Sequence, residues 1–129
     1  MTGKKILIIE DNLLNLELET DLLEANGFVV SSAQTAEEGL RMVRELLPDL
    51  VLMDFSLPGM DGLSATKNLK ADPATRRVVV VALTANAMKG NAEIALNAGC
   101  DGYLTKPIAT RTFIATINQF IASAKLRGQ

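Results

Sequence analysis

The chain has 129 residues, of which 48% are hydrophobic and 22% are charged, and its formal net charge at pH 7 is −2. This size suits one globular domain, and no apolar run approaches the ~20 residues of a membrane-spanning helix. The sequence contains no histidine and one cysteine, Cys100, which excludes a Ser-His-Asp triad, a histidine-ligated metal and an internal disulfide. One tyrosine, no tryptophan and no helix-turn-helix or finger spacing argue against nucleic-acid binding.

Strand-like and helix-like patterns alternate along the chain. In chain order they predict a strand at 5–9, a helix at 12–26, a strand at 28–32, a helix at 35–46, a strand at 50–53, a helix at 62–70, a strand at 78–83, a helix at 87–98, a strand at 102–105 and a helix at 110–125. This alternation predicts an α/β fold with a parallel sheet between helices, as a single domain over residues 1–129 with no output domain. The first strand begins without a preceding secretory segment, which predicts a cytoplasmic protein.

Helix boundaries carry their own signals. Thr35 followed by Glu38 predicts an N-cap with an acidic residue at the third helical position. Gly27 and Gly99 are expected to end helices, and Asp72-Pro73 is expected to end the third one.

Reactive side chains follow the ends of four predicted strands. Glu10 and Asp11 follow the first strand, and Asp54 follows the third. Thr84 follows the fourth strand and Lys106 the fifth. Because open α/β sheets bind ligands at the carboxyl ends of their strands, we expect these five side chains to share one cleft.

The residue types in this cleft predict phosphoryl chemistry on a carboxylate. Glu10, Asp11 and Asp54 would repel one another by about 4 kcal/mol per pair at 4 Å unless a cation lies between them. An oxygen-only set favours Mg²⁺, with Mn²⁺ as an alternative ion. Asp54 is the candidate nucleophile, Lys106 would neutralise phosphoryl oxygens, and Thr84 would donate a hydrogen bond to one of them.

These motifs resemble the receiver domains of response regulators, the CheY-like family, over essentially the whole chain. The matching segments are Ile9-Glu10-Asp11-Asn12, Leu52-Met53-Asp54, Leu57-Pro58-Gly59-Met60-Asp61-Gly62, Leu83-Thr84-Ala85 and Gly99-Cys100-Asp101-Gly102-Tyr103-Leu104-Thr105-Lys106-Pro107. The resemblance implies a doubly wound, flavodoxin-like (βα)5 fold with a five-stranded parallel sheet in the order 2-1-3-4-5.

The resemblance also implies roles for the motif residues. Asp54 would be the phosphoacceptor, Asp11 and Asp54 direct Mg²⁺ ligands, and Glu10 a ligand acting mostly through water. Ser56 would add its backbone carbonyl to the metal site. Glu10 departs from the commoner aspartate, and Ser56 and Asn86 occupy two variable positions that tune phosphoryl lifetime in this family.

A second group of roles concerns signalling. Thr84 and Tyr103 would form a switch pair, and a cis peptide bond before Pro107 would aim Lys106 into the site. Phosphorylation would then alter the surface formed by the fourth helix, the fifth strand and the fifth helix.

The implied function is phosphorelay signalling without enzymatic turnover of a substrate. A histidine kinase or histidine phosphotransfer protein would supply the phosphoryl group, and a downstream protein would read the phosphorylated form of a monomer or weak dimer. The chain resembles stand-alone regulators of the cell-cycle or phosphorelay type.

Three alternatives remain. The segment 82–90 also resembles receivers excised from hybrid histidine kinases. An aspartyl-phosphate phosphatase is disfavoured, because Ser56 stands where those enzymes carry a second aspartate. A flavodoxin-type cofactor binder is disfavoured, because the acidic loop after the first strand repels phosphate.

The first helix contains more leucines than one buried stripe requires. At 100° per residue, Leu18 and Leu22 share one face with Leu14 at its edge, whereas Leu13, Leu16 and Leu23 lie off that face. We therefore expect Leu13, Leu14 and Leu16 to help dock a partner helix bundle; packing against the fifth helix is the alternative.

Overall fold

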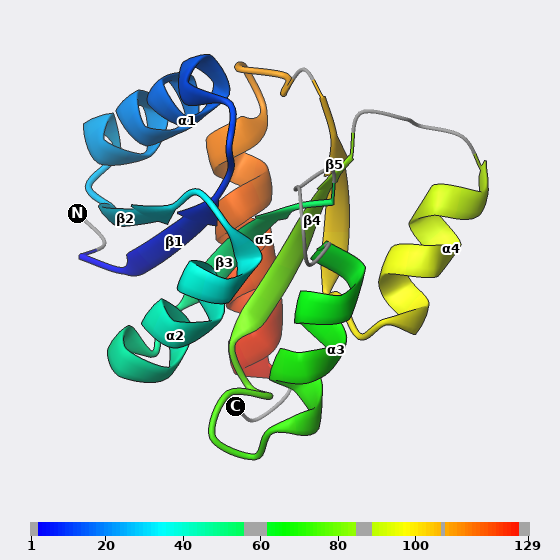
Figure 1. Cartoon of the computed structure of the whole chain (residues 1–129). Helices are drawn as coiled ribbons and strands as arrows, with labels where there is room; N and C mark the ends of the chain where they lie inside the picture. The colour runs from blue at the N-terminus through cyan, green and yellow to red at the C-terminus, as the bar shows by residue number, and fades with distance from the viewer. Residues whose placement is uncertain (1–2, 56–61, 85–88, 107, 127–129) are drawn as a thin grey trace.

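Five parallel strands form one sheet in the order β2-β1-β3-β4-β5, which confirms the expected topology (Figure 1). The computed structural model describes residues 3–55, 62–84, 89–106 and 108–126. The strands are β1 (Lys5–Ile9), β2 (Val29–Ala33), β3 (Leu50–Asp54), β4 (Val79–Thr84) and β5 (Gly102–Thr105). The helices are α1 (Leu13–Ala25), α2 (Ala36–Leu46), α3 (Gly62–Ala71), α4 (Lys89–Asn97) and α5 (Phe113–Leu126).

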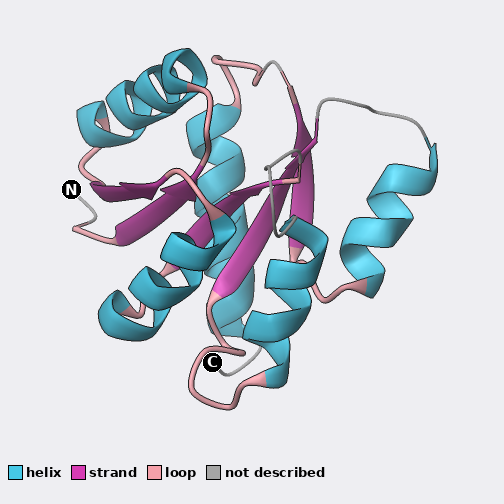
Figure 2. Ribbon diagram, viewed as in Figure 1, coloured by secondary structure: helices cyan, strands magenta, loops and turns pink. Residues whose placement is uncertain are grey.

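Helices cover both faces of the sheet (Figure 2). One hydrophobic cluster joins alternate strand residues such as Leu7 and Val51 to α2, α3 and α4. The other cluster joins Ile8 and Leu52 to Leu23 of α1 and to the inward residues of α5. The central strand β3 is buried along its whole length, as expected for a parallel strand covered on both sides.

The helix boundaries follow the predicted signals. The Thr35 hydroxyl accepts a hydrogen bond from the backbone N–H of Glu38 at 3.1 Å, and the Glu38 carboxylate accepts one from the N–H of Gln34 at 3.2 Å. Gly27 and Gly99 follow α1 and α4 with positive φ angles of 88° and 107°, a conformation that glycine adopts without steric cost. These local interactions fix the start of α2 and the ends of α1 and α4.

The structure shows which side of α1 packs on the sheet. Leu23 is fully buried and Leu16 packs against the core, whereas Leu14 and Leu18 are 80% and 42% exposed. The sequence analysis placed Leu18 and Leu22 on one face with Leu14 at its edge, and of these three leucines Leu22 packs against the core. Because apolar residues occur on both sides of α1, periodicity alone did not identify the side that packs on the sheet.

No helix in the described ranges is long and apolar enough to cross a membrane.

Candidate functional site

The alternation of side chains along each strand brings the predicted site residues to one end of one sheet face. Glu10, Asp54 and Lys106 each follow by two positions a residue that packs in the cluster beneath α1 and α5; those residues are Ile8, Leu52 and Leu104. Since alternate residues of a strand point to the same face, the three ionisable groups continue this face at the carboxyl end of the sheet.

Lys106 lies between two buried carboxylates. Its Nζ is 3.0 Å from Oδ2 of Asp54 and 3.1 Å from Oε1 of Glu10, and it donates a hydrogen bond to Oε2 of Glu10 at 3.3 Å. Glu10 and Asp54 are 0% and 1% exposed. Burial strengthens each of these contacts, because water does not screen them as it screens surface ion pairs.

The carboxylates and the ammonium change one another's proton affinity. The pKa of Glu10 is raised to about 7, and burial is the largest cause. The neighbouring Asp54 also raises this pKa, by more than the hydrogen bond from Lys106 lowers it. Burial lowers the pKa of Lys106, but its interactions with Asp54 and Glu10 outweigh this effect and leave that pKa raised. Lys106 therefore stays charged at neutral pH, whereas Glu10 changes its ionisation near neutral pH.

A divalent cation fits this arrangement. Glu10, Asp11 and Asp54 each offer a carboxylate oxygen, and these atoms lie within 4.8 Å of one another. Oε1 of Glu10 is buried and has no aligned hydrogen-bond donor, although the Lys106 ammonium is near it. Three oxygen ligands around a partly exposed position suit a hard cation that retains some of its water, as Mg²⁺ does.

The end of β4 contributes Thr84 to the site and pairs with β5, which contains Tyr103. Thr84 is buried at the end of β4, and its carbonyl accepts a hydrogen bond from the N–H of Lys106 at 2.8 Å. Tyr103 pairs with Ala82 on the neighbouring strand, and its side chain is 40% exposed. Ser56, Asn86 and Pro107, with the proposed cis peptide bond, lie outside the described residues.

The sequence reasoning did not identify Glu19, a buried acid on α1. Glu19 is 2% exposed, and its Oε1 has no hydrogen-bond partner. Burial raises the pKa of Glu19 to about 8, and the charges of Glu10 and Asp54 act in the same direction against Lys106. The sequence does contain a signal that Glu19 is buried. Glu19 lies three residues after Leu16 and four before Leu23, and residues at these spacings share a helix face.

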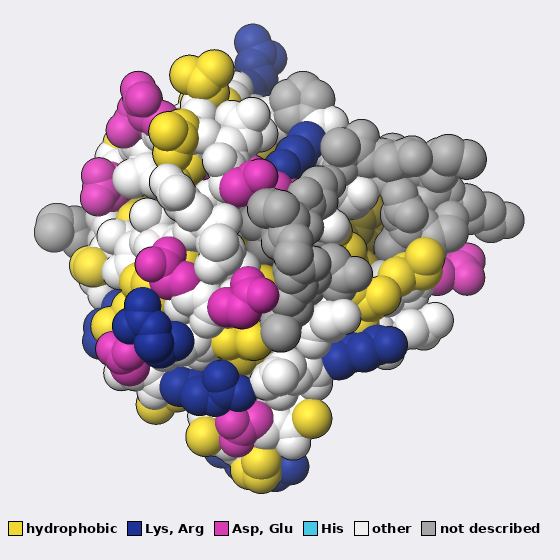
Figure 3. All heavy atoms as spheres, in the orientation of Figure 1, with side chains coloured by type: hydrophobic (Ala, Val, Ile, Leu, Met, Phe, Trp, Pro, Cys, Tyr) yellow, Lys and Arg dark blue, Asp and Glu magenta, His cyan; other side chains and the backbone are white. Residues whose placement is uncertain are grey.

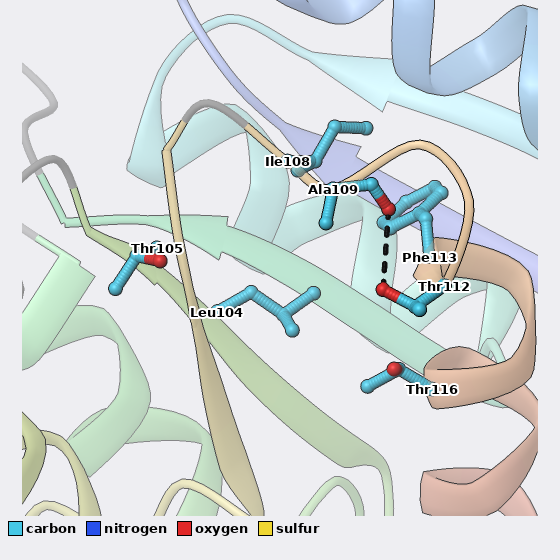
Figure 4. A pocket seen from close by; sticks show the side chains of 7 residues that line it. All are labelled: Leu104, Thr105, Ile108, Ala109, Thr112, Phe113 and Thr116. Carbon is cyan, nitrogen blue, oxygen red and sulfur yellow. Dashed lines mark hydrogen bonds between the residues drawn. The ribbon is translucent and has the colours of Figure 1, made fainter.

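A cavity of about 110 Å³ opens next to the site, between β5 and the beginning of α5. Figure 4 shows its lining, in which the Thr112 hydroxyl bonds to the carbonyl of Ala109 and Leu104 lies below. Its walls are methyl, aromatic and hydroxyl groups without a charge. The cavity therefore offers no carboxylate to a cation, and none of the acidic cluster lines it.

Comparison with known proteins identifies the family and the fold. Residues 6–118 match the response regulator receiver domain. The chain is 44% identical over 121 residues to the polar-differentiation response regulator DivK of Brucella ovis, covering 94% of this chain and 98% of that one.

Two solved structures extend the comparison. The receiver domain of a sensor histidine kinase from Pseudomonas aeruginosa, with a magnesium ion coordinated in its active-site cleft, is 35% identical with a TM-score of 0.86, covering 94% of this chain and 99% of that one. The receiver domain of the Saccharomyces cerevisiae response regulator Ssk1, crystallised with the histidine phosphotransfer protein Ypd1, is 26% identical with a TM-score of 0.86 and coverages of 93% and 90%.

Proposed function

Because the chain belongs to the response regulator receiver domain family, we propose that it accepts a phosphoryl group from phosphohistidine onto Asp54. The observation that carries this proposal is the position of Asp54, which is 1% exposed, ion-paired to Lys106 and grouped with Glu10 and Asp11. A carboxylate in that setting can attack phosphorus, because the neighbouring positive charges offset those of the phosphoryl oxygens.

Each residue of the site would have a separate role in the transfer of the phosphoryl group. An oxygen of Asp54 attacks phosphorus as the bond from phosphorus to the donor histidine nitrogen breaks, so the nitrogen leaves with the electron pair. The Lys106 ammonium, already 3.0 Å from Asp54, holds a phosphoryl oxygen, and the Thr84 hydroxyl donates to another. Glu10 and Asp11, with Asp54 and the carbonyl of Ser56, would hold Mg²⁺, with Mn²⁺ as a substitute. The ion would neutralise charge on the phosphoryl group.

Signalling follows from the movement of two side chains. We infer that Thr84 moves toward the phosphoryl group and that Tyr103, now exposed, turns inward to fill the space. This change would alter the surface formed by α4, β5 and α5, on which a downstream protein binds. The protein would thus assist its own phosphorylation and dephosphorylation without being an enzyme toward other substrates.

The match with DivK supports a stand-alone regulator, and we propose that it acts in the cytoplasm. DivK is named a response regulator, and the match with it covers nearly the full length of both chains. A monomer or weak dimer of one receiver domain over residues 1–129, acting by protein binding alone, is the form we propose. The likeness to the receiver of a sensor histidine kinase favours the second candidate, a domain of a hybrid kinase.

The donor would dock on α1 and the neighbouring loops. The complex of Ssk1 with Ypd1 supports a histidine phosphotransfer protein or a histidine kinase as that donor. Leu13 and Leu14 are exposed beside the acidic cluster and can contact such a partner directly. Leu16, the third leucine expected at the interface, packs against the core and would act only by supporting α1.

Intact-mass measurement tests the proposed chemistry. Incubation with Mg²⁺ and acetyl phosphate is expected to add one phosphoryl group to the wild-type protein and none to Asp54→Asn. A chelator should prevent the addition. Addition to folded Asp54→Asn would show that another residue is the acceptor. If the wild type gains no phosphoryl group, beryllofluoride binding distinguishes the reasons: a wild type that also fails to bind beryllofluoride did not simply lose a short-lived adduct.

A further inference from the structure

Glu19 is a buried acid that no step of the proposed transfer uses. It lies on the side of α1 that packs on the sheet, between Leu16 and Leu23 in the same stripe. Its Oε1 has no hydrogen-bond partner. A buried polar atom without a partner destabilises a fold, so this carboxyl group is costly at its position.

The surroundings of Glu19 connect it to the phosphoacceptor site. The sheet face beneath α1 ends in Glu10 from β1, Asp54 from β3 and Lys106 after β5, and these are the charged groups that act on Glu19. On the same face, α5 contributes Phe113 and Ile117, which carry no charge. Electrostatic coupling is strong in such an interior, because little water lies between the groups.

The charge balance determines the proton on Glu19. With no cation bound, burial and two nearby carboxylates favour its neutral form, and Lys106 alone opposes them. A divalent cation held by Glu10, Asp11 and Asp54 would offset the carboxylate charges that act on Glu19. The two carboxylates would then no longer favour the neutral form of Glu19, whereas burial would still disfavour its charged form.

We propose that Glu19 is a proton-coupled regulator of the metal site: it holds its proton less tightly when a divalent cation binds at Glu10, Asp11 and Asp54, and more tightly again when the cation leaves. Linkage requires the reverse effect as well, so loss of the Glu19 proton strengthens cation binding. The inference rests on the proposed function only for the position of the metal site.

Mg²⁺ affinity as a function of pH tests this coupling. Isothermal titration at pH 6.5, 7.5 and 8.5 would compare the wild type, Glu19→Gln and the control Glu17→Gln, which removes an exposed carboxylate from the same helix. Glu10 titrates in every variant, and its interaction with Glu19 is part of the coupling that the comparison measures. We expect the wild type and the control to gain about five-fold more affinity over this range than Glu19→Gln, a coupling at the low end of the usual range. Equal gains in wild type and Glu19→Gln would overturn the proposal.

A second measurement uses the unmodified protein. Carbon-13 NMR of the glutamate side-chain carboxyl groups, with the Glu19 signal assigned by its absence in Glu19→Gln or Glu19→Leu, should show titration near pH 8 without Mg²⁺. Saturating Mg²⁺ should move that midpoint downward. A midpoint in the ordinary glutamate range, or one that Mg²⁺ does not move, contradicts the coupling. Phosphorylation of Asp54 by acetyl phosphate is measured separately, so the two proposals can fail independently.

Discussion

Two acidic side chains of this protein, Glu10 and Glu19, hold their protons more tightly than they would in water. Lys106 joins Glu10 and Asp54, so one ammonium serves two buried carboxylates. One positive charge does not balance the acidic groups around it, and Glu10 and Glu19 both have raised pKa values, mainly through burial. The site is therefore prepared for an incoming cation, which supplies the missing charge.

The proton on Glu19 makes the stability of the metal-free protein depend on pH. Burial raises its folded-state pKa from 4.5 to about 8, so between these values the folded protein binds a proton that the unfolded chain has lost. Stability must then fall as pH rises from about 5 to 8. The expected loss from Glu19 is roughly 3–5 kcal/mol as an upper figure.

Replacing Glu19 with glutamine should remove this pH dependence. We expect Glu19→Gln to gain stability over the wild type progressively from pH 5 to 8, because glutamine carries no ionisable proton. Urea unfolding in a chelating buffer at several pH values measures the difference. Glu10 contributes a slope of the same sign in both proteins. A constant difference across this pH range would show that Glu19 titrates normally.

At the scale of elements, the ends of helices and strands decide where the site forms. Asn12 accepts a hydrogen bond from the N–H of Asn15 at 3.0 Å and starts α1 directly after Glu10 and Asp11. Gly39 of α2 faces Ile9 so closely that an added Cβ would overlap the isoleucine side chain. These contacts bring the helices close to the strand ends that carry the reactive groups.

The C-cap of α2 is a strained position. Leu47 has φ 45° and ψ 63°, and it is the one residue other than glycine with a positive φ in the described part of the chain. The left-handed conformation costs an L-residue roughly 1–2 kcal/mol, and glycine usually occupies this position. The Leu47 side chain is exposed, so its removal loses little burial.

Leu47→Gly is therefore expected to stabilise the protein by about 0.5–1 kcal/mol, after the greater flexibility of glycine in the unfolded chain is subtracted. Leu46→Gly is the matched control, because Leu46, the last residue of α2, does not have a positive φ and glycine there should destabilise by up to about 1 kcal/mol. Chemical unfolding midpoints measure both changes. A loss of stability in Leu47→Gly would mean that its side chain contributes more packing than its exposure suggests.

In the molecule as a whole, α1 packs one side on the sheet and presents its other side to solvent. The outward side of α1 carries exposed leucines and exposed acidic residues, and Figure 3 shows hydrophobic and acidic side chains together over this helix. Such an apolar face beside the metal site suits a protein donor, which must bring its phosphohistidine close to Asp54.

Polar substitutions on this face should separate two routes of phosphorylation. We expect Leu13→Ser and Leu14→Ser to reduce phosphotransfer from a histidine phosphotransfer protein or kinase about ten-fold or more. Phosphorylation by acetyl phosphate should change little, because that donor needs no docking surface. Val29→Ser, an exposed apolar change on β2, is the control. Unaltered transfer from the protein donor would remove α1 from the interface.

The family, the element order and the residues at the strand ends could all be predicted from the sequence. Continuous apolar runs are typical of buried parallel strands, and their carboxyl ends must meet at one edge. That rule by itself predicts that Glu10, Asp54 and Lys106 lie together, as they do. It identifies neither which carboxylate Lys106 contacts nor the proton affinity of Glu10, because both depend on distances and burial.

Local sequence thus determined where this chain forms helices and strands, since caps, turns and periodicity act over a few residues. Only the tertiary structure decided which face of α1 turns inward. Leucines lie on both sides of that helix, and the side that packs on the sheet includes Glu19 rather than Leu18. The physical reason is that burial is a property of the assembled layers: a carboxyl group becomes a proton-holding acid when neighbouring elements exclude water from it.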